Sequence, residues 1–373
     1  MAPCTSTPLS PPSRTLTVSE GEADQTERLG EAARAASAEG RALRLVGGDT
    51  KSFHGRPVPG EVLSLAGHRG VIAYDPTELV ITARAGTPLA DIETLLAANH
   101  QQFAFEPPIF GPGGTIGGAV ASGLAGARRP FTGAVRDSLL GVTVLNGQGR
   151  ALRFGGTVVK NVAGFDLFRP MAGALGTLGA LLDVSIRVTP RPEREIGVRL
   201  EAPWPQARSR LTALMRRPVP LSGAVHGEGR LHLRLSGPEA GVEALRRELG
   251  GEDEAPAFWD ALRRRAPPPL DAARLWRLSL PPQADQAGIE ALGGRILRDW
   301  AGAEVWLESA APAETIRAAA RTAGGHATLF RGAGPGEAVF EPLPAPLLAL
   351  HRRLKAVFDP AGIFNPGRLY EDL

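Results

Sequence analysis

The run Phe110-Gly111-Pro112-Gly113-Gly114-Thr115-Ile116-Gly117-Gly118-Ala119-Val120-Ala121-Ser122-Gly123 decides the fold of this chain. Glycine recurs throughout the run, and it loses more conformational freedom on folding than any other residue, so such a cluster needs a compensating role. Backbone that lies closely against another group can fill this role by directing N–H groups at it. Concave arrays of N–H groups bind phosphate and other anions. The run therefore predicts a site lined by main chain.

Two further glycine-rich regions flank this run. Upstream, an expected strand at Leu43–Val46 leads into Gly47-Gly48-Asp49-Thr50-Lys51. Downstream come the stretch 160–167 and then Gly173-Ala174-Leu175-Gly176-Thr177-Leu178-Gly179. Each region alone is typical of an ordinary turn. The three in this order and spacing are a far more specific signal.

With these regions, and with Gly133 ahead of Asp137, the sequence resembles the FAD-linked oxidases. The FAD-binding domain of that family is of the vanillyl-alcohol oxidase and p-cresol methylhydroxylase type. The stretches 160–167, 325–331 and 358–368 further resemble the FAD-binding subunits of glycolate oxidases. The resemblance runs from about Thr26 to Leu373. It implies an α+β fold: a two-subdomain FAD-binding domain, an antiparallel α+β cap domain and a C-terminal segment that returns to the FAD domain.

The domain boundaries follow from length and composition together with this resemblance. A chain of 373 residues has room for two or three domains. We expect a disordered tail at 1–22, the FAD-binding domain at 23–192, the cap at 193–335 and the returning segment at 336–373. The Pro190-Arg191-Pro192 sequence marks the end of the first domain.

Hydrophobic spacing predicts the local structure. A helix is expected over Asp24–Ala38, stopped by Gly40, and a second one is expected to be capped by Thr87 with Pro88 at its first position. In the cap, strands alternate with helices, one of them over Ala287–Trp300. The last helix is expected over Pro346–Val357. The residues expected to face inward from it are Leu347, Leu350, Leu354 and Phe358.

Composition excludes several classes of protein. The net charge is +3 and the basic residues are scattered, whereas a nucleic-acid-binding protein needs a concentrated basic stripe. The only cysteine, Cys4, leaves no intrachain disulfide and no cysteine-held metal or iron–sulfur cluster. No apolar run of 18 residues and no signal pattern occurs. We therefore expect a cytoplasmic protein that reaches the inner face of a membrane only through partners.

The resemblance implies FAD as the cofactor and assigns residues to it. Val46–Lys51 is expected at the pyrophosphate, the Thr115 region at the pyrophosphate and flavin, and Gly179–Leu182 beside the adenine. The expected cofactor-binding residues are Val46, Gly47, Gly48, Asp49, Thr50, Lys51, Gly113, Thr115, Ile116, Gly117, Gly118, Ser122, Gly123, Gly133, Lys160, Gly179, Leu181 and Leu182. Two interpretations stay open for each lysine: Lys51 faces the phosphates or is a solvated surface residue, and Lys160 complements the cofactor's charge or forms an interdomain salt bridge.

The resemblance also bears on attachment and catalysis. Relatives with covalent FAD use a His in the first loop or a Cys beside the second, whereas Asp49 stands in the first and no Cys follows Cys4, so we expect noncovalent FAD. Relatives that oxidise 2-hydroxy acids carry a Glu where Ala174-Leu175 stands. No catalytic residue is therefore assigned.

Three histidines and an arginine are considered for the substrate side. The stretch from His226 to His232 is similar to a metal-binding signature of those relatives, but it departs from the pattern at Glu228 and Arg230 and is also typical of a structural hairpin; no metal site is expected. His326 and Arg331 are candidates for contact with substrate, with a packing role as the alternative for each.

Several functions compete at this point. The leading hypothesis is the FAD subunit of a complex that oxidises glycolate, a 2-hydroxy acid, to glyoxylate together with a catalytic flavoprotein subunit and an iron–sulfur subunit. The alternative is a self-sufficient FAD-dependent oxidase or dehydrogenase of another hydroxy acid or sugar alcohol. A nucleotide- or NAD-binding module is disfavoured because neither G-x-G-x-x-G nor G-K-S/T occurs. A scaffold that has lost FAD would purify without colour.

Overall fold

The computed structural model describes residues 24–157, 166–334 and 336–373. The expected tail at 1–22 and the candidate Lys160 lie outside the described residues. Helix α1 (Thr26–Glu39) buries small apolar side chains at helical spacing and ends where Gly40 adopts a left-handed conformation with φ of 64°. Strand β1 (Leu43–Val46) follows and pairs in parallel with β2 (Glu61–Ser64).

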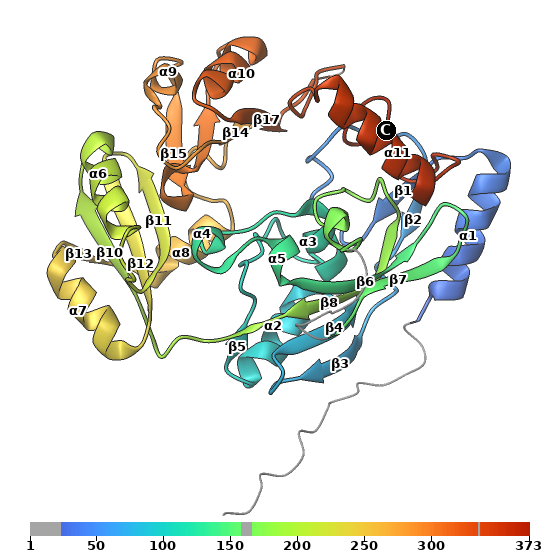
Figure 1. Cartoon of the computed structure of the whole chain (residues 1–373), viewed down its shortest axis with the longest axis horizontal. Helices are drawn as coiled ribbons and strands as arrows, with labels where there is room; N and C mark the ends of the chain where they lie inside the picture. The colour runs from blue at the N-terminus through green and yellow to red at the C-terminus, as the bar shows by residue number, and fades with distance from the viewer. Residues whose placement is uncertain (1–23, 158–165, 335) are drawn as a thin grey trace, which may run out of the picture.

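A five-stranded antiparallel sheet forms the body of the first domain (Figure 1). Its order is β3 (Val71–Asp75), β4 (Val80–Arg84), β8 (Ala180–Arg187), β6 (Leu139–Leu145) and β7 (Ala151–Gly155). The helices α2 (Leu89–Ala98) and α3 (Ile116–Ser122) contribute to the core of this domain through Ile92, Leu96 and Val120. The connecting elements are β5 (Gln101–Gln102), α4 (Arg129–Thr132), α5 (Val135–Ser138), η1 (Arg169–Met171) and β9 (Thr189–Pro190).

The second half of the chain forms an eight-stranded sheet in which each neighbouring pair is antiparallel. The expected boundary near residue 192 falls between β9 and β10. The strands, in sheet order, are β13 (Glu252–Glu254), β10 (Arg194–Glu201), β12 (Arg230–Gly237), β11 (Leu221–Gly227), β15 (Arg295–Asp299), β16 (Glu304–Glu308), β14 (Leu275–Ser279) and β17 (His326–Arg331). The helical segments are α6 (Trp204–Leu214), α7 (Glu239–Leu249), α8 (Pro256–Arg263), α9 (Ala287–Glu290), η2 (Trp300–Gly302) and α10 (Ala313–Thr322).

Two local predictions are wrong. The helix expected over Ala287–Trp300 stops at Glu290, because Gly293 and Gly294 take positive φ values of 68° and 98°, and the chain then enters β15. A Cβ at Gly294 would lie 1.8 Å from the Glu308 carbonyl oxygen, so the strand pairing itself requires glycine there. Thr87 does not cap α2: its hydroxyl donates to the Arg84 carbonyl oxygen, and Pro88 occupies the N-cap position.

A third prediction, the inward face of the last helix, is also wrong. Helix α11 (Ala345–Phe358) is anchored by a lysine and not by its leucines. Leu347 and Leu350 are 47% and 43% exposed, contrary to the expectation that they face inward, while Phe358 is buried. Lys355 is also buried, and its ammonium group donates to the carbonyl oxygens of Thr177 and Phe364 and to Asp359, each at 2.7 Å. A fully satisfied cation can take the place of an apolar anchor.

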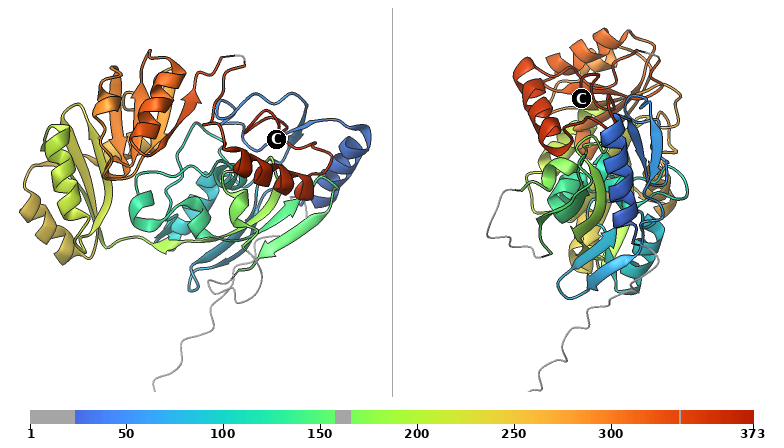
Figure 2. Two further views of the ribbon diagram at one scale, coloured as in Figure 1. Left: turned by 45° about the horizontal axis from the view of Figure 1, so that its top comes forward. Right: turned by 90° about the vertical axis from the view of Figure 1, so that its right-hand side faces the viewer.

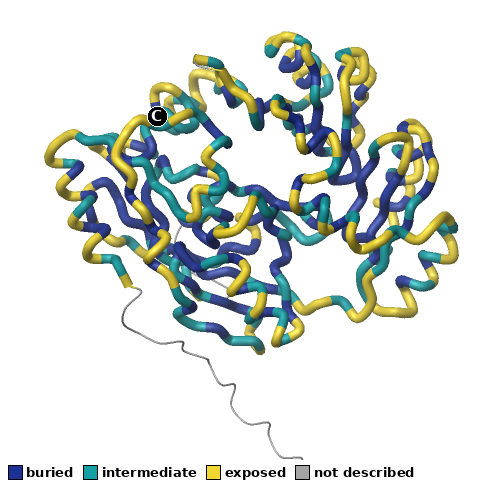
Figure 3. Tube along the Cα trace, turned by 180° about the vertical axis from the view of Figure 1, so that it is seen from behind, coloured by how far each residue is buried: buried dark blue, intermediate teal, exposed yellow. Residues whose placement is uncertain are grey.

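The C-terminal helix lies with the first domain and not with the cap, as two views show (Figures 1 and 2). The buried residues follow the strands of both sheets, whereas exposed residues gather on the helices and loops (Figure 3). Across the three described ranges, no helix has the length and hydropathy that crossing a membrane would require.

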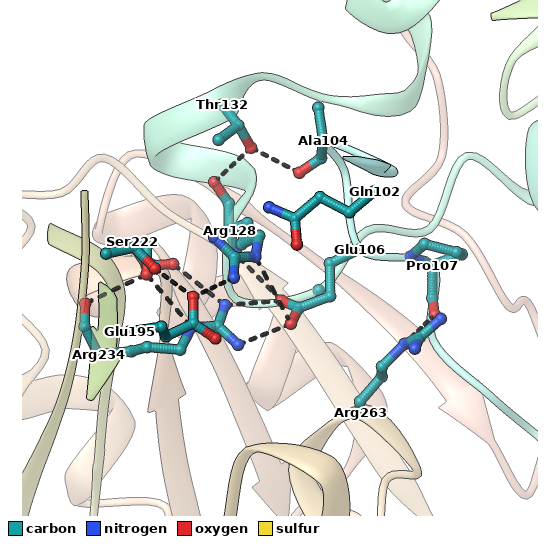
Figure 4. Close-up of polar contacts among 12 residues, drawn as sticks. Gln102, Ala104, Glu106, Pro107, Arg128, Thr132, Glu195, Ser222, Arg234 and Arg263 are labelled. Atoms are coloured by element: carbon teal, nitrogen blue, oxygen red, sulfur yellow. Dashed lines mark hydrogen bonds and ion pairs between the residues drawn. The ribbon is translucent and has the colours of Figure 1, made fainter. Parts of the chain in front are cut away.

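A buried ion pair joins the two domains (Figure 4). Arg234 of β12 donates to both carboxylate oxygens of Glu106 at 2.7 and 2.9 Å. Burial alone would raise the pKa of Glu106, but the charge and hydrogen bonds of Arg234 outweigh it and lower that pKa. Arg128 stands beside this pair and bonds Glu195 of β10, and Arg263 of α8 donates to the Pro107 carbonyl oxygen at 2.9 Å.

Candidate functional site: a cleft lined by main chain

Three segments that lie far apart in the sequence line two adjoining cavities of the first domain. The lining residues that the sequence predicts are Val46, Gly47, Gly48, Asp49, Thr50, Lys51, Thr115, Gly117, Gly118, Ser122, Gly179 and Leu181. The two cavities share Val46, Gly47, Thr115 and Gly118, so they form one continuous cleft. The geometry thus brings the three predicted loops together.

The other predicted residues that the structure describes do not line the cleft. Ile116 and Leu182 are buried in the core, and Gly123 ends α3 in a left-handed conformation against Gly173. Gly113 lies against Gly48 of the first loop, and Gly133 lies beside Asp137 outside both cavities. Their roles at a cofactor stay predictions.

The first and second loops touch so closely that only glycine fits between them. A Cβ added at Gly48 would lie 1.6 Å from the carbonyl oxygen of Gly113, and one at Gly47 would lie 2.5 Å from the hydroxyl oxygen of Thr115. A Cβ at Gly117 would meet Ala85 at 2.5 Å. The glycines therefore hold the two loops in direct contact.

Among the described residues, the N–H groups of the first loop are free, whereas those at the start of α3 are occupied. In the second, the N–H groups of Ile116, Gly117 and Gly118 donate to the Thr87 carbonyl, the Ala85 carbonyl and the Thr115 hydroxyl. In the first, the backbone N–H groups of 47–51 have no acceptor within the described part of the chain. Asp49 sits in the middle of this loop at a φ of 50°, and a left-handed residue lets successive N–H groups converge on one side. The loop 47–51 therefore fits an anion.

Lys51 adds a cation to the same loop. It lines the cleft, its ammonium group lies 5.8 Å from the centre of the Phe110 ring, and burial lowers its pKa to about 8. No carboxylate pairs with it in the ranges that the structure describes. Lys51 is partly buried and lines the cleft, which favours the interpretation that it faces the phosphates. A bound pyrophosphate would supply the missing negative charge.

The C-terminal segment completes the cleft through residues that the sequence did not single out. Asn365 and Arg368 line it beside Leu175. Arg368 donates to the carbonyl oxygens of Arg56 and Ser52, which fixes the end of the first loop. The only signal for them was the Asn365-Pro366-Gly367-Arg368 sequence, which carried the family resemblance but no assigned role.

The two histidines of the signature-like stretch contact protein groups on a hairpin. His226 and His232 lie on the β11–β12 hairpin, where His226 Nε2 is 2.9 Å from the Ala202 carbonyl and His232 Nδ1 is 2.5 Å from Glu254. No cluster of three metal-ligating side chains occurs in residues 24–157, 166–334 and 336–373. The hairpin interpretation agrees with the structure.

The two substrate-side candidates, Arg331 and His326, differ in their contacts. Arg331 donates to the carbonyl oxygens of Leu270 and Ala272 at 3.1 and 3.0 Å, which supports its packing role. His326 begins β17. Its pKa is lowered mainly by partial burial and, to a smaller extent, by the charge of Arg277.

A further histidine, His54, is fully buried beside Phe330. Burial, together with the charges of Arg277, Arg368 and Lys51, lowers its pKa to about 3. His54 is therefore neutral.

Comparisons with known proteins agree with this cleft. A family model described as an FAD binding domain matches residues 22–155, and another described as FAD linked oxidases, C-terminal domain, matches residues 337–369. Over 353 residues the chain is 45% identical to glycolate oxidase subunit GlcE of Escherichia coli (strain K12), covering 94% of this chain and 99% of that protein. It is 25% identical over 357 residues to a D-lactate dehydrogenase of Archaeoglobus fulgidus, covering 81% of this chain and 80% of that protein.

A solved structure of alkyldihydroxyacetonephosphate synthase has the same fold, with a TM-score of 0.66 and 14% identity over 92% of this chain and 75% of that chain. The fold and the cleft define a flavoprotein of the vanillyl-alcohol oxidase type. The chain belongs to the FAD-linked oxidase family. FAD is its cofactor, and the protein is an FAD-dependent oxidoreductase.

Proposed function

We propose that this chain is the FAD-binding subunit of a glycolate-oxidising complex, in which glycolate becomes glyoxylate and electrons pass to an iron–sulfur partner. The observation that carries the proposal is the 45% identity to a glycolate oxidase subunit over 99% of that protein's length. A second relative, glycolate oxidase subunit GlcD of Bacillus subtilis, is 31% identical over 37% of this chain and 29% of its own length. The partners proposed here are a catalytic flavoprotein subunit and an iron–sulfur subunit.

The cleft has a definite part in this proposal. The N–H groups of 47–51 and the ammonium group of Lys51 bind the pyrophosphate, and Gly179 with Leu181 borders the adenine. Oxidation of glycolate removes two electrons and two protons, and bound FAD supplies the two-electron acceptor. No covalent link is proposed, because Asp49 occupies the loop position and pairs with Arg44.

The chain's own residues favour a supporting role in the chemistry. Leu175 lines both cavities with an aliphatic side chain, so it offers no group that can take the substrate's hydroxyl proton there. The catalytic base remains unassigned, and the proposal gives the proton transfer to the catalytic flavoprotein subunit. The complex is placed in the cytoplasm, with any contact to the inner face of the membrane made by partners.

Co-purification tests this proposal. The tagged chain is isolated with its partners, and the visible spectrum is recorded before and after addition of glycolate. We expect a flavin spectrum that bleaches with glycolate in the complex and does not bleach in the isolated chain. Bleaching of the isolated chain would establish the self-sufficient alternative, and a colourless preparation would refute the FAD assignment. Acid precipitation of the isolated chain should release the flavin into solution; a yellow washed pellet would contradict noncovalent binding.

A further inference from the structure

Trp300 is a residue of the cap that packs into the core of the first domain. It lies in η2 of the cap, is 3% exposed, and packs within the core cluster of the first domain. Its indole N–H donates to the carbonyl oxygen of Gly126 at 2.9 Å. The indole ring is thus a fixed element of the junction between the two domains.

Two guanidinium groups from the two domains lie on this one ring. Arg129 of α4 lies 4.2 Å from the ring centre, and Arg277 of β14 lies 5.1 Å from it. Like charges repel, so two arginines at one ring need negative charge close by. The proximity of Arg277 contributes, after burial, to lowering the pKa of Arg129.

The described residues supply only part of that negative charge. Arg277 donates through Nε to Glu304 at 2.6 Å, and its terminal nitrogens have no acceptor in the described part of the chain. Arg129 forms neither an ion pair nor a side-chain hydrogen bond with any described residue, although it is half buried. Glu304 is itself shared, because its second oxygen accepts the indole N–H of Trp306 at 2.9 Å.

The remaining charges nearby do not restore the balance. Arg265 is buried with its guanidinium group 4.7 Å from the centre of the Trp306 ring. Asp299 is fully buried next to Glu304, and burial together with the charge of Glu304 raises its pKa to about 7, so near neutral pH it carries only part of a charge. Three arginines therefore share Glu304 and the partly charged Asp299, while Glu106, which also lies near, is already paired with Arg234.

This charged junction adjoins the cofactor loop. Arg277 is close enough to His54 to lower its pKa, together with Arg368 and Lys51, which line the cleft. His54 in turn packs against Phe330 of β17, in the strand that pairs with β14. The excess positive charge thus lies on the cap side of the site that holds FAD.

We infer that Arg129 and Arg277 together bind the carboxylate group of a small organic acid at the junction between the FAD-binding domain and the cap. The planar guanidinium fork matches a carboxylate, and a partly buried site strengthens the bond. The inference deepens the proposed function, on which it rests, by naming the residues that recognise the acid. Because one arginine comes from each domain, the bound acid also links the cap to the first domain.

Isothermal calorimetry on the full-length, FAD-loaded chain tests the inference without requiring turnover. Glycolate is compared with ethylene glycol, which lacks the carboxylate, and with chloride and inorganic phosphate as simple anions. We expect glycolate to bind and ethylene glycol not to bind. Arg129→Gln and Arg277→Gln should each weaken glycolate binding about tenfold or more, since hydrogen bonds to charged groups reach that size. Arg129→Lys and Arg277→Lys should lose less.

Arg210→Gln is the matched control, because Arg210 is an exposed arginine on α6 of the cap and is not among the charges that act on Arg129. It should leave glycolate affinity unchanged. Equal affinity of the two Gln variants and the parent chain would overturn the inference, as would the absence of glycolate binding or equal binding of phosphate. Flavin content is measured in every variant. A parent chain without flavin would refute the proposed function instead, and loss of flavin only in the Gln variants would show that these arginines serve the cofactor.

Discussion

Asn365 bridges Leu45 of β1 to the Gly173–Gly179 loop across the cofactor cleft. Its side-chain oxygen accepts the Leu45 backbone N–H at 2.8 Å, and its amide nitrogen donates to the carbonyl oxygen of Leu175 at 2.6 Å. The backbone on both sides of Asn365 also pairs with Leu43, through Leu43 N–H to Ile363 and Asn365 N–H to Leu43. One side chain therefore fixes the spacing of two cleft walls.

Replacing Asn365 should open the cleft. Asn365→Asp keeps the acceptor for Leu45 but loses the donor to Leu175, so we expect a stability loss of about 1 to 3 kcal/mol and weaker FAD binding. Asn365→Gly tolerates the φ of 42° at this position and removes both bonds, so it should lose at least as much. Thermal unfolding with and without FAD measures both effects; variants as stable as the parent would contradict the bridging role.

Gly48→Ala should remove the cofactor. Its Cβ would lie 1.6 Å from the carbonyl oxygen of Gly113, so the first and second loops must separate. We expect FAD affinity to fall by more than tenfold, since such overpacking costs about 1 to 3 kcal/mol and displaces the anion-binding loop. Gly114→Ala is the control, because its Cβ meets nothing closer than 3.7 Å. FAD titration by absorbance compares the Gly48→Ala and Gly114→Ala variants. Equal FAD affinities would contradict the requirement for glycine at position 48.

Lys51 should make FAD binding sensitive to pH. Burial lowers its pKa to about 8 in the free protein, below its unfolded value, so its buried charge lowers stability below pH 8 and this cost disappears as pH rises toward 10.5. A bound pyrophosphate needs the charged form and raises this pKa. FAD affinity should therefore decrease above pH 8.

The Lys51→Met variant isolates this effect. It should weaken FAD binding about tenfold or more at pH 7 and remove the decline above pH 8, while the flavin-free protein gains stability at neutral pH. Lys51→Arg keeps a charge throughout and should bind FAD without the decline. Fluorescence titration of FAD across pH 7 to 10 is the measurement. A decline that persists in Lys51→Met would assign it to another group.

The Glu106–Arg234 pair should hold the cap in place. Glu106→Gln leaves Arg234 buried without its countercharge, and breaking a buried pair in this way costs about 3 to 5 kcal/mol. Glu106→Gln combined with Arg234→Met should recover part of the loss. Denaturant unfolding measures this, and a Glu106→Gln variant with parental stability would show that the pair contributes nothing.

The Glu106–Arg234 pair should also make the stability of the protein decrease at acidic pH. The pKa of Glu106 is lowered in the folded state because Arg234 outweighs the opposing effect of burial. Its stabilisation is therefore complete above the unfolded pKa of a glutamate and is lost as pH falls through the lower folded pKa. Unfolding free energy should decline in that acidic range, and the decline should be smaller in the double variant.

The sequence predicted what depends on local pattern. The β6–β7 hairpin, the cap strands and the glycine loops follow from alternation, turn residues and glycine spacing. It mispredicted β15 because Ile289, Leu292 and Ile296 also fit a helical spacing, and only the pairing with β16 decides between the two. It missed Asn365 because its partners lie 320 and 190 residues away. Likewise, the inward face of α11 depends on carbonyl groups that no local pattern reveals.

The pairing of β1 with the segment 363–365 has a consequence for biosynthesis. β1 forms one wall of the cleft, and besides its pairing with β2 that wall is secured by residues near position 365. A nascent chain on the ribosome therefore lacks a finished cleft until this late segment has emerged from the exit tunnel. Cofactor loading must follow translation of residues 363–365, and a polypeptide that ends before residue 363 should be unable to retain flavin.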